Sequence, residues 1–246
     1  MLLLTGRFWR YPLRMPYLER DGDVFVLHLG DRSGGDTENR FHPDWLSAVH
    51  ALLDEVVAHD GPAALVTAAT GKFWSNGLDT DWIFGNLPGL PGYLDSVHEL
   101  YARILTFPAA TVAAVQGHAF GAGAMLALTH DFRVMRADRG FWCLPEVSLN
   151  MPFTVGMSAL LRERLPIQAA VEATTTGRRF GGGDALAAGI VDRAVDGDTV
   201  LAAAVERAAA LTGTRGANLA GIKRGLHAPL IAALETKTDE SNFRLG

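Results

Sequence analysis

The chain has 246 residues, enough for a sizeable core and near the upper limit of one domain with appendages. Hydrophobic residues make up 48% and charged residues 20%, a globular composition, and the net charge of −5 argues against a nucleic-acid-binding protein. The chain has a single cysteine, Cys143, so it cannot form an internal disulfide. No Cys/His cluster has the spacing of metal ligands. No apolar stretch reaches the roughly 18 residues that cross a bilayer. We therefore expect a cytoplasmic protein without a metal site, a membrane span or a nucleic-acid partner.

The N-terminal region contains a second methionine, Met15, which begins the sequence MPYLERDGDVFVLHLG. This sequence resembles a natural start that leads directly into a strand, so we expect residues 1–14 to be an N-terminal extension. The expected division of the rest is a core at 15–195 and a C-terminal helical region at 196–246.

Strands and helices are predicted to alternate over the first two-thirds of the chain. Apolar, β-branched runs predict strands and apolar residues at helical spacing predict helices. The predicted strands are 24–29, 63–68, 111–117 and 131–138, and the predicted helices are 43–58, 95–105 and one that starts within 117–131. This alternation favours βαβ units, with helices outside a largely parallel sheet.

The last third of the chain is mainly helical by the same criteria. From about residue 155 onward, alanine-rich segments predict helices at 157–165, 168–177, 184–190 and 201–213, with one strand at 189–195. No internal sequence repeat and no long low-complexity linker interrupts the chain.

Two loops rich in small residues follow the second and third predicted strands. Asn76-Gly77-Leu78-Asp79 follows one strand and Gly121-Ala122-Gly123 follows the other, so we expect both at one edge of the sheet. Unpaired N–H groups at helix starts there could converge on one ligand oxygen. A phosphate loop is the weaker alternative, because neither the G-x-G-x-x-G spacing nor the G-K-[ST] motif is present. The glycines could also simply let a helix pack close to the sheet.

Glu146 is a carboxylate in an apolar neighbourhood, RGFWCLPEVSLNMPF. Burial there would raise its pKa and make it a useful general base. The alternative is structural: Glu146 caps the next helix or pairs with an arginine such as Arg139.

Four segments, in this order and spacing, resemble the crotonase superfamily, the enoyl-CoA hydratase/isomerase family. They are GKFWSNGLD (71–79), AAVQGHAFGAGAMLALTHDF (113–132), PEVSL (145–149) and GRRFGGGDALAAGIVDRAV (177–195). The resemblance implies an α/β crotonase-like fold, a repeated ββα spiral core with C-terminal helices for trimerisation. A homotrimer or a dimer of trimers is then expected.

The resemblance also implies an acyl-CoA thioester as substrate, so that CoA is part of the substrate and no cofactor is needed. It makes Glu146 the catalytic residue and the backbone N–H groups of Leu78 and Ala122 the oxyanion hole. Lys223 and Arg224 resemble basic positions that meet CoA phosphates. Further substrate- or CoA-contacting residues are expected at Lys72, Trp74, Ser75, Asn76, Gly77, Asp79, Gly121, Met125, Trp142 and Phe153, although Asp79 could instead cap a helix and the aromatic residues could fill the core.

One departure from the hydratase pattern indicates the reaction. Met125 stands where hydratases carry a second glutamate that helps to hold the attacking water. One remaining carboxylate is the arrangement of Δ3,Δ2-enoyl-CoA isomerases. The alternatives are a divergent hydratase, a CoA-thioester hydrolase and a non-catalytic acyl-CoA-binding protein. The depth of the acyl pocket is expected to depend on how segment 82–94 folds over the site, and GNLPGLPGY (85–93) within it is expected to be a mobile flap.

Overall fold

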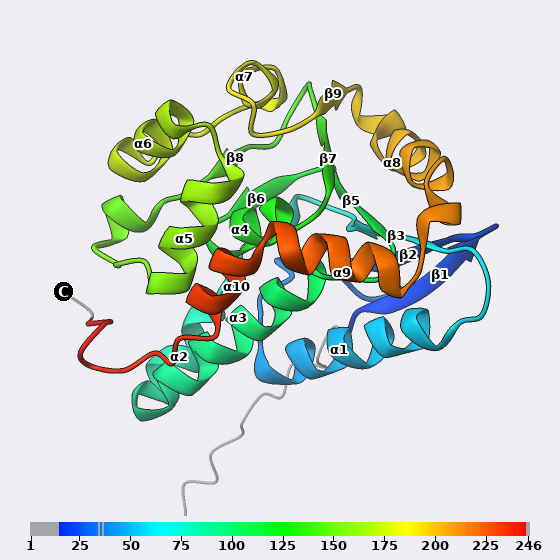
Figure 1. The fold of residues 1–246 in the computed structure, drawn as a ribbon. Helices are drawn as coiled ribbons and strands as arrows, with labels where there is room; N and C mark the ends of the chain where they lie inside the picture. Colours follow the sequence, from blue (N-terminus) through cyan, green and yellow to red (C-terminus); the bar gives the residue numbers. More distant parts are fainter. Residues whose placement is uncertain (1–14, 34, 36, 245–246) are drawn as a thin grey trace, which may run out of the picture.

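The computed structural model describes residues 15–33, 35 and 37–244 (Figure 1). The expected extension at 1–14 lies outside these residues. Two sheets organise the described chain. The larger sheet has the order β1-β2-β3-β5-β7-β9 and the smaller one the order β4-β6-β8. All pairings are parallel except that of β1 with β2.

The elements are, for the larger sheet, β1 (Tyr17–Asp21), β2 (Val24–His28), β3 (Ala64–Ala68), β5 (Ala110–Val115), β7 (Phe132–Arg136) and β9 (Arg193–Val195), and for the smaller sheet β4 (Phe73–Ser75), β6 (His118–Phe120) and β8 (Trp142–Cys143). The helices are α1 (Pro43–Ala58), α2 (Thr80–Gly85), α3 (Leu90–Leu105), α4 (Ala122–Leu128), α5 (Val155–Arg164), α6 (Ile167–Thr176), α7 (Gly182–Ala187), α8 (Val200–Ala209), α9 (Ala217–Leu226) and α10 (Ala228–Leu234). Single 3-10 turns are formed by η1 (Leu87–Gly89), η2 (Glu146–Leu149), η3 (Gly197–Thr199) and η4 (Thr212–Thr214).

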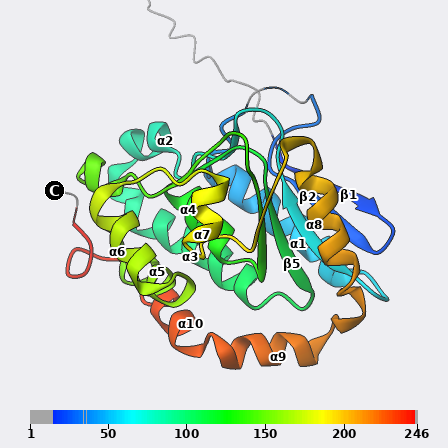
Figure 2. The same cartoon turned by 90° about the horizontal axis from the view of Figure 1, so that it is seen from above.

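The larger sheet is covered on both faces, which explains its uninterrupted apolar strands. One face packs against Val200, Ala204 and their neighbours on α8, and the other packs against α1, α3 and α4. All residues of β2, β3 and β5 are buried in consequence, as expected for central parallel strands. Helices α9 and α10 run along the outer edge of the molecule (Figure 2).

Three successive ββα units form the core. In each of the pairs β3–β4, β5–β6 and β7–β8, the first strand joins the larger sheet and the second joins the smaller one. A helical segment follows each pair. The structure therefore confirms the repeated ββα core, and the repeat exists in the fold without a repeat in the sequence.

Most predicted elements are confirmed, but several boundaries and short strands were wrong. The helix predicted at 43–58 is α1, whereas α3 begins at Leu90 instead of at 95. The three strands of the smaller sheet were not predicted, because two or three residues are too few to show a period. Much of segment 82–94, which contains the expected flap at 85–93, is helical, in α2, η1 and the first turn of α3.

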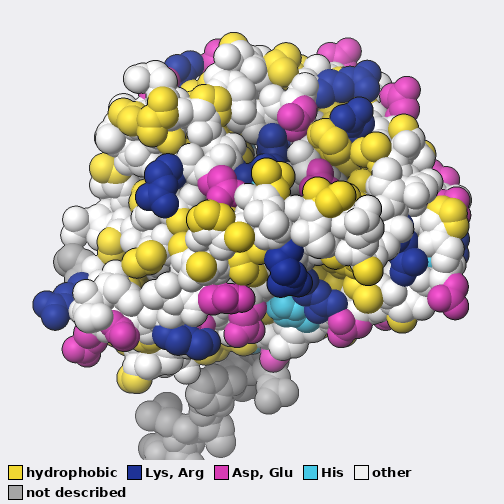
Figure 3. Space-filling model, in the orientation of Figure 1, with side chains coloured by type: hydrophobic (Ala, Val, Ile, Leu, Met, Phe, Trp, Pro, Cys, Tyr) yellow, Lys and Arg dark blue, Asp and Glu magenta, His cyan; other side chains and the backbone are white. Residues whose placement is uncertain are grey.

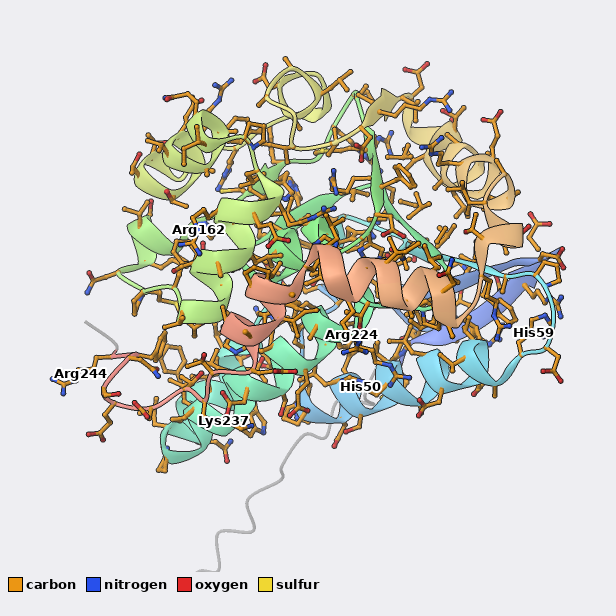
Figure 4. All side chains as sticks on the ribbon, in the orientation of Figure 1. His50, His59, Arg162, Arg224, Lys237 and Arg244 are labelled. Carbon is orange, nitrogen blue, oxygen red and sulfur yellow. The ribbon has the colours of Figure 1, made fainter. Side chains whose placement is uncertain are left out.

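Lys223 on α9 is not free to meet a CoA phosphate, contrary to the prediction. Its ammonium is buried and donates to Asp131 Oδ2 at 2.5 Å and to the Ala109 carbonyl at 2.8 Å, which ties α9 to the core. Its neighbour Arg224 is exposed and lies between α9 and α1, on the side of α9 where His50 is labelled (Figure 4).

We expect Lys223→Met to lower the free energy of unfolding by about 3 kcal/mol, because the Asp131 carboxylate would lose its buried partner. Chemical denaturation measures the change, with Arg224→Met as the exposed control, which should have a nearly unchanged stability. Equal stability of both variants would contradict a structural role for the ion pair.

The surface seen in Figure 3 intersperses acidic and basic side chains with apolar ones. Within the described ranges, no helix has the length and hydropathy required to span a bilayer.

Candidate active site

The smaller sheet brings the two loops together. Asn76 follows β4 and Gly121 follows β6, and these strands pair in parallel, so both loops lie at the same edge. We expected both loops at an edge of the predicted larger sheet, but they lie at an edge of the smaller sheet. A Cβ added to Gly77, which has a φ of +79°, would lie 2.8 Å from both the Ala122 nitrogen and the Phe120 carbonyl oxygen. Only glycine allows this contact between the loops.

The Leu78 and Ala122 N–H groups have no hydrogen-bond acceptor among the described residues. Ala122 is the first residue of α4, where the N–H groups have no intrahelical partner. Both residues line a common cavity. The two donors are therefore available to a ligand oxygen, as an oxyanion hole requires.

Glu146 lies directly beside the second loop. The backbone N–H of Gly121 donates to the Cys143 carbonyl at 3.0 Å, which places the segment after β8 against Gly121. A Cβ on Gly121 would lie 3.1 Å from Glu146 Oε1. The carboxylate therefore faces the start of α4.

Burial raises the pKa of Glu146 from its ordinary value of 4.5 to about 7. The residue is 8% exposed, and its Oε2 atom has no hydrogen-bond partner within the described chain. The structure excludes the helix-capping alternative, since Thr154 caps α5 through its Oγ1. No ion pair joins Glu146 to Arg139 in the described residues. A carboxylate with this pKa and a free oxygen suits proton transfer near neutral pH.

The cavity has a volume of about 500 Å³, in the range of small-molecule sites. Its described lining is mostly apolar and contains one acidic residue, Glu146, and one basic residue, Arg40. The guanidinium of Arg40 bonds to Glu38, Thr80 and Asp81. The remaining lining residues are Asn76, Leu78, Thr80, Ile83, Phe84, Leu90, Leu94, Phe120, Gly121, Ala122, Met125, Pro145, Leu149, Asn150, Met151, Pro152, Met157 and Phe243.

A family model described as enoyl-CoA hydratase/isomerase matches residues 38–244. The chain belongs to the enoyl-CoA hydratase/isomerase family. It is 36% identical to enoyl-CoA delta isomerase 2, peroxisomal, of Arabidopsis thaliana over 234 residues, which cover 89% of this chain and 96% of that protein.

Solved structures agree with this family membership. A probable enoyl-CoA hydratase of Mycobacterium tuberculosis superposes with a TM-score of 0.82 at 27% identity, covering 90% of this chain and 92% of that one. Human mitochondrial delta3-delta2-enoyl-CoA isomerase has a TM-score of 0.81 at 22% identity, covering 90% and 86%, which shows a shared crotonase fold.

The family-derived site residues divide into two groups. Those in the cavity are Asn76, Leu78, Gly121, Ala122, Met125 and Glu146. Trp74, Ser75 and Trp142 are fully buried away from the cavity, and the two tryptophans fill the core, which was their alternative role. The Trp74 and Trp142 indoles donate to the Thr67 and Ala124 carbonyls, and the Ser75 hydroxyl donates to the Asn39 carbonyl, so these residues stabilise the smaller sheet.

Four other predicted contacts lie outside the cavity lining. Asp79 caps α2 by accepting the Trp82 N–H at 3.1 Å, which was its alternative role. Gly77 packs against the backbone of the second loop, at Phe120 and Ala122. Phe153 packs against the hydrophobic core. Lys72 is exposed, with its ammonium 5.2 Å from the centre of the Phe73 ring, and its contact with CoA stays a prediction.

The sequence missed much of the apolar lining of this enoyl-CoA hydratase/isomerase site. Ile83, Leu90 and Leu94 come from segment 82–94, whose influence on pocket depth was expected although its helices were not. Phe243 reaches the cavity from the end of the chain, and no local pattern indicated this contact.

Proposed function

We propose that this chain is an enoyl-CoA isomerase that converts a 3-enoyl-CoA into a 2-enoyl-CoA. One observation carries the proposal. Glu146, with a pKa raised to about 7 by burial, is the only acidic side chain among the described residues of the cavity, and it lies beside unpaired N–H donors. The name of the Arabidopsis relative, enoyl-CoA delta isomerase, supports the same reaction.

In this mechanism the thioester oxygen accepts the Leu78 and Ala122 N–H groups. The Glu146 carboxylate removes a proton from C2, and the electron pair of the C–H bond moves into a dienolate whose charge lies on the thioester oxygen. The protonated Glu146 then returns the proton to C4, which leaves the double bond between C2 and C3. No atom is gained or lost, and each N–H donor would stabilise the dienolate by roughly 3 to 4 kcal/mol.

Met125 supports isomerisation over hydration. Its side chain is buried and lines the cavity, at the position where the resemblance to the hydratases implies a second glutamate. An apolar thioether cannot hold a water molecule as a carboxylate does. The cavity therefore provides a proton carrier without a second acidic group for an attacking water.

The purified protein is expected to convert 3-hexenoyl-CoA to 2-hexenoyl-CoA and to hydrate 2-hexenoyl-CoA at least about 100-fold more slowly, because one general-base contact to water is typically worth that factor. Absorbance of the conjugated enoyl thioester and chromatography of the products measure both reactions.

Three results would contradict the proposal: faster hydration than isomerisation indicates a hydratase, release of free CoA indicates a thioesterase, and binding without turnover indicates a non-catalytic protein. We further propose that CoA enters only as part of the substrate, with no resident cofactor. The expected trimer and cytoplasmic location stay predictions.

A further inference from the structure

Helix α3 carries two buried tyrosines whose hydroxyls reach the two loops of the site. Tyr93 is 4% exposed and Tyr101 is 0% exposed, and they lie about two helical turns apart. Neither side chain lines the cavity, so neither is placed to contact the substrate. Burial raises the pKa of both phenols, which keeps them protonated at neutral pH.

Tyr93 closes a chain of hydrogen bonds around Leu78. The Phe41 N–H donates to the Gly77 carbonyl at 2.8 Å, and the Tyr93 hydroxyl donates to the Phe41 carbonyl at 2.9 Å. The same hydroxyl oxygen accepts the Asp79 N–H at 2.9 Å. The Gly77 carbonyl shares a planar peptide group with the Leu78 N–H, and the Asp79 N–H belongs to the next peptide group. These bonds therefore fix the peptide planes on both sides of Leu78.

Tyr101 holds the other loop. Its hydroxyl donates to the Ala122 carbonyl at 2.7 Å, in the first turn of α4. The Gly121 carbonyl, which shares a peptide group with the Ala122 N–H, accepts the Met125 N–H at 3.0 Å. Gly121 has a φ of +52°, so the chain turns sharply just before Ala122. The tyrosine thus anchors the backbone directly after that turn.

We infer that Tyr93 and Tyr101 are positioning residues that aim the Leu78 and Ala122 N–H groups at the thioester oxygen. The inference rests on the proposed function, because it takes these two groups as the oxyanion donors. Oxyanion donors stabilise developing charge only when they are held in place before the reaction. Because one rigid helix supplies both anchors, the distance between the two donors is set by α3.

Tyr93→Phe and Tyr101→Phe each remove one hydroxyl. Each variant is expected to lower kcat by roughly 10-fold to 100-fold, less than the loss of a donor itself, with KM changed by less than about threefold. The direct readout is infrared difference spectroscopy of bound hexanoyl-CoA labelled with ¹³C at the thioester carbonyl. In the wild type the C=O stretch should move to lower frequency than in water, and each variant should lose part of that shift.

Thr67→Val is the matched control, because it also removes a buried hydroxyl with a hydrogen bond, 2.8 Å to His130, and it touches neither loop. It should lose stability and keep both kcat and the carbonyl shift. Tyrosine variants that keep the wild-type kcat and carbonyl shift would overturn the inference, as would a wild type that binds hexanoyl-CoA without any shift or does not bind it. A wild type that shows the shift, loses it in the variants and does not isomerise 3-hexenoyl-CoA would support the inference and refute the proposed reaction.

Discussion

Replacing Glu146 by glutamine is expected to lower kcat for isomerisation by about 100-fold to 10,000-fold, the usual contribution of a general base. Glutamine keeps the shape of the side chain but cannot accept and return a proton. KM should change little, because the thioester oxygen is held by backbone N–H groups of other residues. Steady-state kinetics with 3-hexenoyl-CoA measure the effect, and unchanged turnover would exclude Glu146 as the base.

The pH dependence of kcat/KM in the wild-type protein is a second test of the role of Glu146. The base must be ionised in the free enzyme, and burial raises the pKa of Glu146 to about 7. The value of kcat/KM should therefore rise with pH up to about 7 and then level off. A plateau that extends down to pH 5 would contradict this assignment.

Glu146→Gln should also make the protein more stable at alkaline pH. Because folding raises the pKa of Glu146 from 4.5 to about 7, its contribution to stability is present below pH 4.5 and is lost as the pH rises through 7. The ionised carboxylate then costs about 2 to 4 kcal/mol, because the pKa rises from 4.5 to about 7 and each pKa unit corresponds to about 1.4 kcal/mol. Denaturation at pH 8 should show Glu146→Gln to be more stable than the wild type by an amount in that range, and equal stability at pH 8 would contradict the burial cost.

Gly77→Ala is the second substitution with a large expected effect. Its Cβ would lie 2.8 Å from the Ala122 nitrogen and from the Phe120 carbonyl oxygen, at a φ of +79°. The loops must separate to admit a methyl group, which displaces both N–H donors. We expect kcat to fall by about 100-fold to 1,000-fold, as for the loss of one oxyanion donor, and the free energy of unfolding to fall by about 2 to 4 kcal/mol.

Gly92→Ala provides the matched control for this experiment. Gly92 lies in α3, has an ordinary φ, and would place its Cβ with nothing within 4 Å. Alanine there should keep full activity and stabilise the helix slightly. If Gly77→Ala matched Gly92→Ala in both kcat and stability, the contact between the loops would not matter for the site.

The sequence predicts those parts of the molecule that carry a local signal. Helix α1 was found with its full length because its apolar residues recur over four turns and Pro43 marks its start. Strand β3 was found because an apolar, β-branched run indicates burial on both faces. The chemistry of the loops was also readable, since Gly121 and Glu146 are unusual residue types in their surroundings.

The missed features depend on contacts between distant parts of the chain. Strands β4, β6 and β8 have two or three residues each, and they exist because they pair with one another. Trp142 was expected either to contact the substrate or to fill the core, and the pairing of β8 decides for the core, where its indole donates to the Ala124 carbonyl. Phe243 reaches the cavity from a segment with no periodic pattern.

The three ββα units of the core divide the work of the site. In each unit, the second strand leads to one functional group of the site. Strand β4 of the first unit leads to the Leu78 N–H, β6 of the second unit leads to the Ala122 N–H, and β8 of the third unit leads to Glu146. In the proposed mechanism, the first two units therefore recognise the carbonyl group, and the third supplies the proton carrier. A change of residue type in the third unit can therefore alter which bond is made or broken while the recognition of a thioester is kept. This separation provides a physical route by which one scaffold acquires several reactions of the same class of substrate.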